Sequence, residues 1–308
     1  MASSTRAANA RIPRDKPADG WPAAVGAFLS QPGLSAQTRR SYRLTLAVLT
    51  VALDAAGAEP TAEAIEAAAR LRWGTVAPAT WNRHGATVRS FLRYAARHRL
   101  LSELEVTLDR RREPADRTRA LPRAALERLW ARRDIAMVDK TLWRLLYETA
   151  ARAGEALALN VEDLDLANRR AVIRGKNGEL DFLHWQTGTG HLLTRLITGR
   201  PTGPVFLTER RTSPARAPAA VDLCPHTRRP RLSYRRAQER FAAASGGWTL
   251  HQLRHSALTH LAEANVGLPL LMAKSRHTSL RSLQKYARPG VDAVARLTAE
   301  HDPARRRH

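Results

Sequence analysis

Residues 248–290 read WTLHQLRHSALTHLAEANVGLPLLMAKSRHTSLRSLQKYARPG, and this stretch decides which fold and chemistry to expect. Thr249 stands directly before a run with helical periodicity, where a threonine typically caps the first turn. Side chains three and four positions apart share a face of such a helix. The stretch carries His251, Arg254 and His255 on that face, followed by His277 and Tyr286. Imidazoles, a fixed guanidinium and a tyrosine suit a phosphodiester that the tyrosine attacks.

The composition favours a polyanionic partner. The chain has 308 residues, a length that suits two domains, and 44% of them are hydrophobic, which is enough for packed cores. Lys and Arg number 51 against 28 Asp and Glu, so the net charge is +23. Because the excess is spread over the whole chain, we expect a nucleic-acid partner. The alternative is a solvated basic surface without a binding role.

Other classes of protein are excluded by what the sequence lacks. The single cysteine, Cys224, cannot form a disulfide within the chain and excludes a zinc site built on cysteines. No apolar run reaches the roughly 18 residues of a membrane span. Residues 1–19 lack the apolar core of a secretory signal and are expected to form a disordered basic arm. The sequence therefore predicts a cytoplasmic protein with no membrane partner.

Residues 20–102 are expected to form a small helical domain. Helical periodicity marks the segments 21–30, 35–57, 61–73 and 78–99. Arginines flank the apolar stripes, where they suit phosphate contacts or are simply solvated. The candidates for DNA contact are Arg39, Arg40, Arg43, Arg83, Arg89 and Arg93. Residues 103–120 lose the periodicity and are highly charged, which predicts an exposed linker.

Residues 121–308 are expected to form a second, α+β domain. A helix begins near Leu121, and a second one leads to Arg152, with Glu155 placed to pair with it. Residues 171–175 and 180–185 read as two strands joined at Lys176-Asn177-Gly178, because Asn-Gly is a strong hairpin signal. Further helices are expected over 187–199, 232–244 and 291–300. The fold class is thus mainly α with a small β-hairpin.

Attack of a tyrosine on DNA sets chemical demands that six residues of this chain meet. The developing phosphate charge must be neutralised, the tyrosine must lose a proton, and the leaving 5′ oxygen must gain one. Guanidinium groups suit the phosphate oxygens, and histidine or lysine moves protons. The set consists of Arg152, Lys176, His251, Arg254, His277 and Tyr286. Spacing alone does not require these residues to converge.

The motifs resemble those of the tyrosine recombinases, also called the phage integrase family. Arg152-Ala-Gly-Glu155 is similar to the family's R-x-x-E box, and His251-Gln-Leu-Arg254-His255 matches its H-x-L-R-H box at each fixed position. Three further segments are similar to the L-G-H-x-S box, the hairpin lysine segment and the nucleophile segment: Ser275-Arg276-His277-Thr278-Ser279, Ile173-Arg174-Gly175-Lys176 and Gln284-Lys285-Tyr286.

The resemblance implies a fold and a role for each site residue. Residues 20–102 would be the helical core-binding domain and residues 121–308 the catalytic domain of the tyrosine-recombinase type. The enzyme would cut and rejoin duplex DNA at a specific site through a 3′-phosphotyrosine bond, without metal, ATP or another cofactor. It would act as a homotetramer on paired sites, with accessory DNA-bending proteins, in the nucleoid. The implied catalytic residues are the six above, supported by Glu155 and His255.

Two departures from the family pattern and several rival interpretations stay open. Arg276 and Ala150 stand where the family has glycine, a residue that relaxes turns. Rival functions are type IB topoisomerase-like strand relaxation, a hairpin-forming resolvase and a DNA-binding module without catalysis. His251 and His255 also have the spacing of a zinc helix, but Gln252 stands where that motif needs a glutamate.

Overall fold

The computed structural model describes residues 20–114, 120–175, 178–211 and 218–277, and the single positions 279, 283, 298 and 299. The chain divides into two compact units, Met1–Asp116 and Arg117–His308, each described here by itself. The expected arm 1–19, Lys176, Tyr286 and most of the expected helix 291–300 lie outside the described residues. In the described ranges, no helix is long and apolar enough to cross a membrane.

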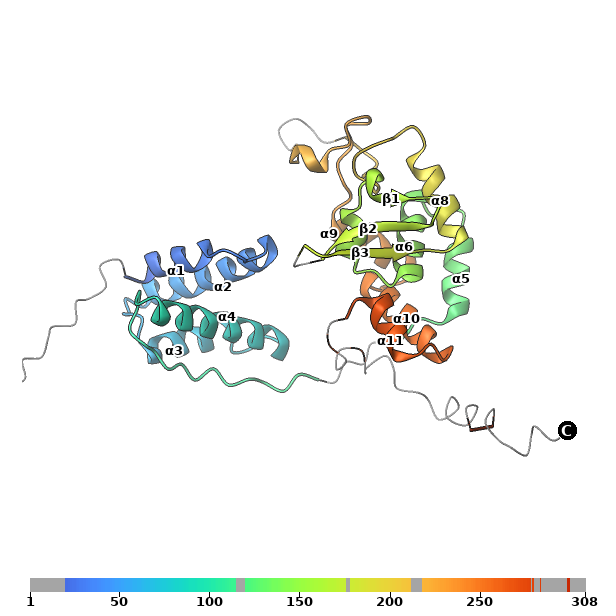
Figure 1. Cartoon of the computed structure of the whole chain (residues 1–308). Helices are drawn as coiled ribbons and strands as arrows, with labels where there is room; N and C mark the ends of the chain where they lie inside the picture. Colours follow the sequence, from blue (N-terminus) through green and yellow to red (C-terminus); the bar gives the residue numbers. More distant parts are fainter. Residues whose placement is uncertain are drawn as a thin grey trace, which may run out of the picture. The chain divides into compact units, whose positions relative to one another are not determined.

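The described part of the first unit is a helical bundle, as the sequence predicts. Its helices are α1 (Gly20–Ser30), α2 (Ala36–Ala55), α3 (Ala62–Trp73) and α4 (Pro78–Arg97) (Figure 1). Ser35 and Thr61 cap α2 and α3 by accepting a hydrogen bond from the main chain, and Pro78 opens α4. The apolar stripes meet in one core that includes Phe28, Leu46, Leu49, Ile65 and Phe91.

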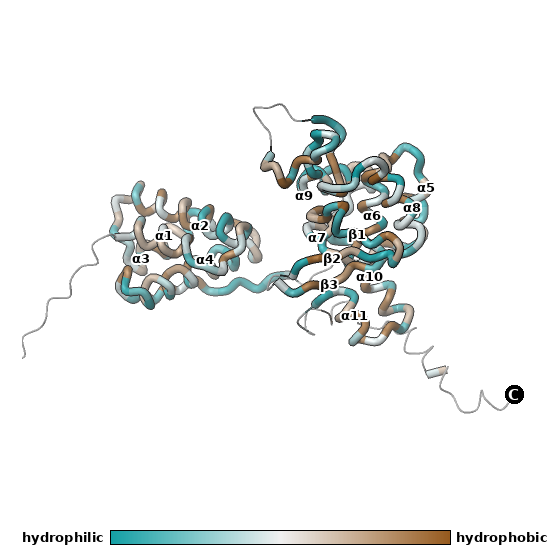
Figure 2. Tube along the Cα trace, turned by 45° about the horizontal axis from the view of Figure 1, so that its top comes forward, coloured by the Kyte–Doolittle hydropathy of each residue, from teal (hydrophilic) through white to brown (hydrophobic). Residues whose placement is uncertain are grey.

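Residues 104–113 form a strap on this bundle, which differs from the exposed linker expected over 103–120. Trp81 Nε1 donates to Asp109 O at 2.7 Å, and Asn82 exchanges two hydrogen bonds with the main chain of Arg111. The Arg111 guanidinium lies 4.0 Å from the centre of the Trp81 ring, and Leu108 is only 4% exposed. The sequence of residues 109–113 is strongly hydrophilic (Figure 2), but its main chain is anchored to the helices by these bonds.

The second unit contains a three-stranded antiparallel sheet in the order β1-β2-β3. The expected hairpin is confirmed by β2 (Arg170–Arg174) and β3 (Leu180–His184), whose register pairs Arg170 with His184 and Arg174 with Leu180. Its turn contains Gly178 at φ 81°, a value that favours glycine. β1 (Leu164–Asp165) adds a third strand that the sequence did not predict.

Helices surround this sheet and position the polar residues of interest. They are α5 (Arg123–Ala131), α6 (Met137–Thr149), α7 (Ala153–Ala158), α8 (Thr187–Ile197), α9 (Tyr234–Ser245), α10 (Leu250–Glu263) and α11 (Leu268–Ser275). Short 3-10 turns lie at Val161–Asp163 and Ala220–Asp222. Helix α6 is central, because it packs against α8, α9, α10 and β3. Trp143, Leu146, Phe241 and Leu253 are fully buried in this core.

Candidate active site

Arg254 is fixed at the junction of α6, α10 and α11. Thr249 caps α10 as predicted, in a reciprocal pair of hydrogen bonds with Gln252. Arg254 lies one turn further on and is only 2% exposed. Its guanidinium donates from Nη1 to Ala150 O and from Nη2 to Ser275 O at 2.6 Å. Main-chain carbonyls of two other segments therefore hold this arginine in one orientation.

His277 lies beside the Arg254 guanidinium. Arg254 Nη2 is 3.3 Å from His277 Nε2, and His277 Nδ1 is 2.7 Å from Ser275 Oγ. A guanidinium has only donors, so the contact with Arg254 suits Nε2 as the acceptor. The His277 ring is thus held between the Arg254 guanidinium and the Ser275 hydroxyl.

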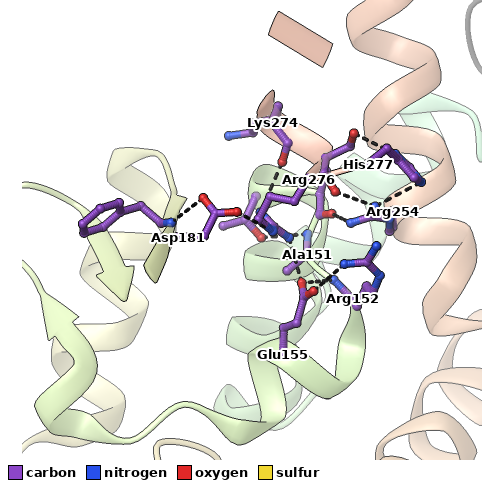
Figure 3. Close-up of polar contacts among 12 residues, drawn as sticks. Ala151, Arg152, Glu155, Asp181, Arg254, Lys274, Arg276 and His277 are labelled. Atoms are coloured by element: carbon purple, nitrogen blue, oxygen red, sulfur yellow. Dashed lines mark hydrogen bonds and ion pairs between the residues drawn. The ribbon is translucent and has the colours of Figure 1, made fainter. Parts of the chain in front are cut away.

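Arg152 directly precedes α7, next to these groups, and it pairs with Glu155 in the first turn of that helix. Glu155 Oε2 accepts from Arg152 N at 2.9 Å, and Oε1 accepts from Arg152 Nη1 at 2.7 Å (Figure 3). The expected pair between the two residues is therefore formed. The Arg152 side chain is 53% exposed, in contrast to buried Arg254, so an incoming anion can reach it from solvent.

Acid should remove the stabilisation that Glu155 gives to the folded state. Burial alone raises the pKa of Glu155, but Arg276 and Arg152 outweigh burial and hold the pKa below its ordinary value of 4.5. Since the folded-state pKa is the lower one, the stabilisation is fully present above pH 4.5 and is lost as the pH falls through the folded-state pKa.

We therefore expect Glu155→Gln to melt at a lower temperature than the wild type at neutral pH, and this gap to narrow below about pH 4. Thermal unfolding followed by circular dichroism across the pH range measures the gap. Glu127→Gln, which removes an exposed carboxylate of α5, is the matched control. A gap that stays constant into acid would contradict the expectation.

The two histidines of the predicted set on α10 differ in burial. His255 is buried at 8% exposure on α10, whereas His251, four residues before it, is exposed. Within the described ranges, no group of three or more His, Cys, Asp or Glu side chains is arranged to hold a metal ion. Lys176 and Tyr286 lie outside the described residues.

The six arginines predicted to contact DNA lie on α2 and α4. Arg40, Arg43, Arg83 and Arg93 are exposed, as a surface that meets phosphates requires. The other two, Arg39 and Arg89, are partly buried. Arg89 Nη1 donates to Leu108 O at 2.7 Å, so part of its guanidinium fastens the strap to α4.

Arg276 belongs to the same polar cluster, although the motif comparison identified it only as a departure from glycine. It ends α11 in the left-handed conformation, at φ 55° and ψ 40°. Its side chain is 8% exposed, and Nη2 donates to Glu155 Oε2 at 2.7 Å. The other departure, Ala150, is also left-handed, at φ 52°, and supplies the carbonyl that Arg254 binds. Both backbone positions thus have the geometry that favours glycine.

Comparison with known proteins identifies the family of this chain. The model of the phage integrase family matches residues 119–291. The tyrosine recombinase XerC of Mycobacterium tuberculosis is 29% identical over 298 residues, which cover 89% of this chain and 94% of the relative. The tyrosine recombinase XerD of the same species is 30% identical over 179 residues, 56% of this chain and 54% of the relative.

Solved structures share the fold. The Tn1549 transposon integrase in complex with circular intermediate DNA has a TM-score of 0.62 at 15% identity and covers 90% of this chain and 98% of its own. A lambda integrase dimer bound to a core site also has a TM-score of 0.62 at 15% identity, with 87% and 95% covered. The family match spans more than half of the chain and includes the Arg152, Arg254 and His277 cluster. The chain therefore belongs to the phage integrase family and is a site-specific tyrosine recombinase.

Proposed function

We propose that this protein cuts and rejoins duplex DNA at a specific site through a covalent bond between Tyr286 and a 3′ phosphate. The observation that carries the proposal is the junction at Arg254. This side chain binds Ala150 O, 104 residues away in sequence and two residues before Arg152, and it also contacts His277. Two guanidiniums and an imidazole from three segments thereby share one small region. Such a set suits the non-bridging oxygens of a phosphodiester.

The proposed reaction needs neither a metal nor ATP. The Tyr286 hydroxyl attacks phosphorus and gives its proton to His251, while the bond to the 5′ oxygen breaks and Lys176 protonates that oxygen. Arg152, Arg254 and His277 bind the phosphate as its charge increases. The phosphotyrosine bond keeps the energy of the broken bond, so the reverse attack by a 5′ hydroxyl reseals DNA. Glu155 and His255 orient the groups that touch the phosphate.

We further propose double-stranded DNA as the partner and a homotetramer as the working assembly. Support for DNA comes from the net charge of +23 and from relatives solved on DNA, such as the lambda integrase tetramer bound to a Holliday junction (TM-score 0.63, 15% identity). In the tetramer, residues 291–300 would dock on a neighbouring protomer. We also propose that accessory DNA-bending proteins take part and that the enzyme associates with the nucleoid.

A suicide duplex tests the function. The binding site is first recovered by selection from a pool of random duplexes, and a nick is then placed beside the cleaved phosphate so that resealing is prevented. We expect a covalent protein–DNA adduct on a denaturing gel, formed equally well in the presence of EDTA.

Other outcomes would support the rival functions. Binding without an adduct on any recovered site would support the DNA-binding module, and loss of the adduct in EDTA would support the metal interpretation. Relaxation of a supercoiled plasmid without exchange of strands between two sites would support the topoisomerase interpretation.

A further inference from the structure

We propose that Arg276 is a positioning residue for the cleavage reaction, which holds Arg152 in place through their shared carboxylate, Glu155. The inference rests on the proposed function, in which Arg152 binds the scissile phosphate. It is carried by three observations on described residues: the strained backbone at Arg276, its partly buried ion pair, and the effect of its charge on the pKa of Glu155.

The backbone at Arg276 favours a different residue. At φ 55° and ψ 40° an arginine is strained, whereas a glycine adopts the same conformation without strain. Among the described residues Arg99, Arg169 and Arg228 have similar φ values, so the backbone alone does not single out Arg276. The role of Arg276 therefore depends on the contacts of its side chain.

The side chain of Arg276 is buried among groups of the site. It is 8% exposed, and Nη2 donates to Glu155 Oε2 at 2.7 Å. Its Nη1 donates to Lys274 O at 3.2 Å, and Nε lies 3.8 Å from Asp181 Oδ2 on strand β3. In Figure 3, dashed lines join Glu155 to both the Arg276 and the Arg152 guanidiniums. One carboxylate thus connects the turn before His277 to the start of α7.

The charge of Arg276 lowers the pKa of Glu155. Burial raises the pKa of Glu155, and Arg276 is the strongest of the opposing influences that bring this pKa below its ordinary value. Without Arg276, the carboxylate would lose the largest single influence that lowers its pKa, so its pKa would rise. A protonated Glu155 would hold Arg152 less firmly, since hydrogen bonds to a charged acceptor are about twice as strong as neutral ones.

The arrangement also connects the hairpin to the phosphate-binding arginine. Asp181 lies on β3, the strand that follows the hairpin turn, and its carboxylate faces the same guanidinium that holds Glu155. A shift of the hairpin would therefore change the position of Arg276 and, through Glu155, that of Arg152. Arg276 is thus the residue through which three segments of the site keep a common geometry.

The test measures single-turnover cleavage of the suicide duplex by Arg276→Met, Arg276→Gly and Arg276→Lys across a range of pH. We expect Arg276→Met and Arg276→Gly to cleave about 10–100-fold more slowly than the wild type, because a displaced catalytic group costs about that much. The loss should deepen as the pH falls, since Glu155 then protonates. Arg276→Lys should recover part of the rate, and Arg235→Met, which removes a 90% exposed arginine, is the matched control.

A double-mutant cycle separates positioning from simple structural damage. If Arg276 acts through Arg152, adding Arg276→Met to Arg152→Ala should reduce the residual rate little further. The inference is overturned if Arg276→Gly cleaves as fast as the wild type, or if Arg276→Met causes its full loss in the Arg152→Ala background. Failure of the proposed function is distinct, because the wild type itself would then form no adduct.

Discussion

Tyr286→Phe is expected to abolish the covalent adduct with DNA while duplex binding stays intact. The change removes only the hydroxyl that would attack phosphorus, and loss of a nucleophile lowers the rate of covalent catalysis by about 10⁴-fold or more. The contacts that supply binding, mainly basic side chains to phosphates, do not involve this hydroxyl. A denaturing gel measures the adduct, and a mobility shift under native conditions measures binding.

Tyr234→Phe provides the control for this experiment. Tyr234 begins α9 and is 52% exposed, so loss of its hydroxyl should leave both the fold and the adduct unchanged. Peptide mapping of the wild-type adduct should locate the DNA on Tyr286. An adduct that survives in Tyr286→Phe would refute the assignment of the nucleophile, and its location would identify the true one.

Arg152→Ala and Arg254→Ala are expected to stop cleavage alike but to differ sharply in their effect on stability. Each removes a guanidinium that would neutralise the phosphate, which should lower the cleavage rate by about 10²–10³-fold or more. Arg254 is 2% exposed and binds two main-chain carbonyls, so its loss leaves these buried acceptors without that donor and should cost about 2–5 kcal/mol of unfolding free energy. Arg152 is 53% exposed, and its loss should cost at most about 1 kcal/mol.

Denaturant unfolding of the full-length variants measures this contrast. Arg128→Ala, an exposed position on α5, serves as the control for the loss of an arginine. If Arg152→Ala and Arg254→Ala lost the same unfolding free energy, the expectation that the buried arginine contributes more to stability would be wrong. A variant that unfolds like the wild type but cleaves poorly isolates the chemical contribution of its guanidinium.

Much of the fold follows from local patterns in the sequence. Apolar residues at helical spacing predicted the four helices of the first unit, and Asn177-Gly178 predicted the hairpin. β1 was missed because two residues carry no periodicity, and only pairing with β2 makes them a strand. The strap, residues 104–113, was predicted to be part of a linker because its apolar residues do not recur at helical spacing. Its apolar residues at every second position, Val106 and Leu108 among them, are the signal of an extended segment with one buried side.

The motifs predict members of the candidate site, but not the contacts between them. Resemblance to the family's motifs singled out Arg152, Arg254 and His277, and in the structure Arg254 contacts His277 and the carbonyl of Ala150, two residues before Arg152. Burial of Arg254 could not be inferred, because its partners are main-chain carbonyls of distant segments. The ion pair of Arg276 with Glu155 also depends on tertiary contact between residues 121 positions apart. The sequence did mark two positions of the site as unusual, since Arg276 and Ala150 both stand where the family has glycine.

The outer strand of the sheet has a consequence for how this protein behaves at high concentration. β3 pairs with β2 alone among the described strands, and its Leu180 and Phe182 are exposed. An exposed, partly apolar strand at a sheet edge is a site where chains aggregate. Two main-chain groups of this strand form hydrogen bonds with charged side chains. Asp181 Oδ1 accepts from Phe182 N at 2.7 Å, and Lys274 Nζ donates to His184 O at 2.9 Å. These two main-chain groups are therefore already hydrogen-bonded within the chain and are less available to pair with a strand of another molecule.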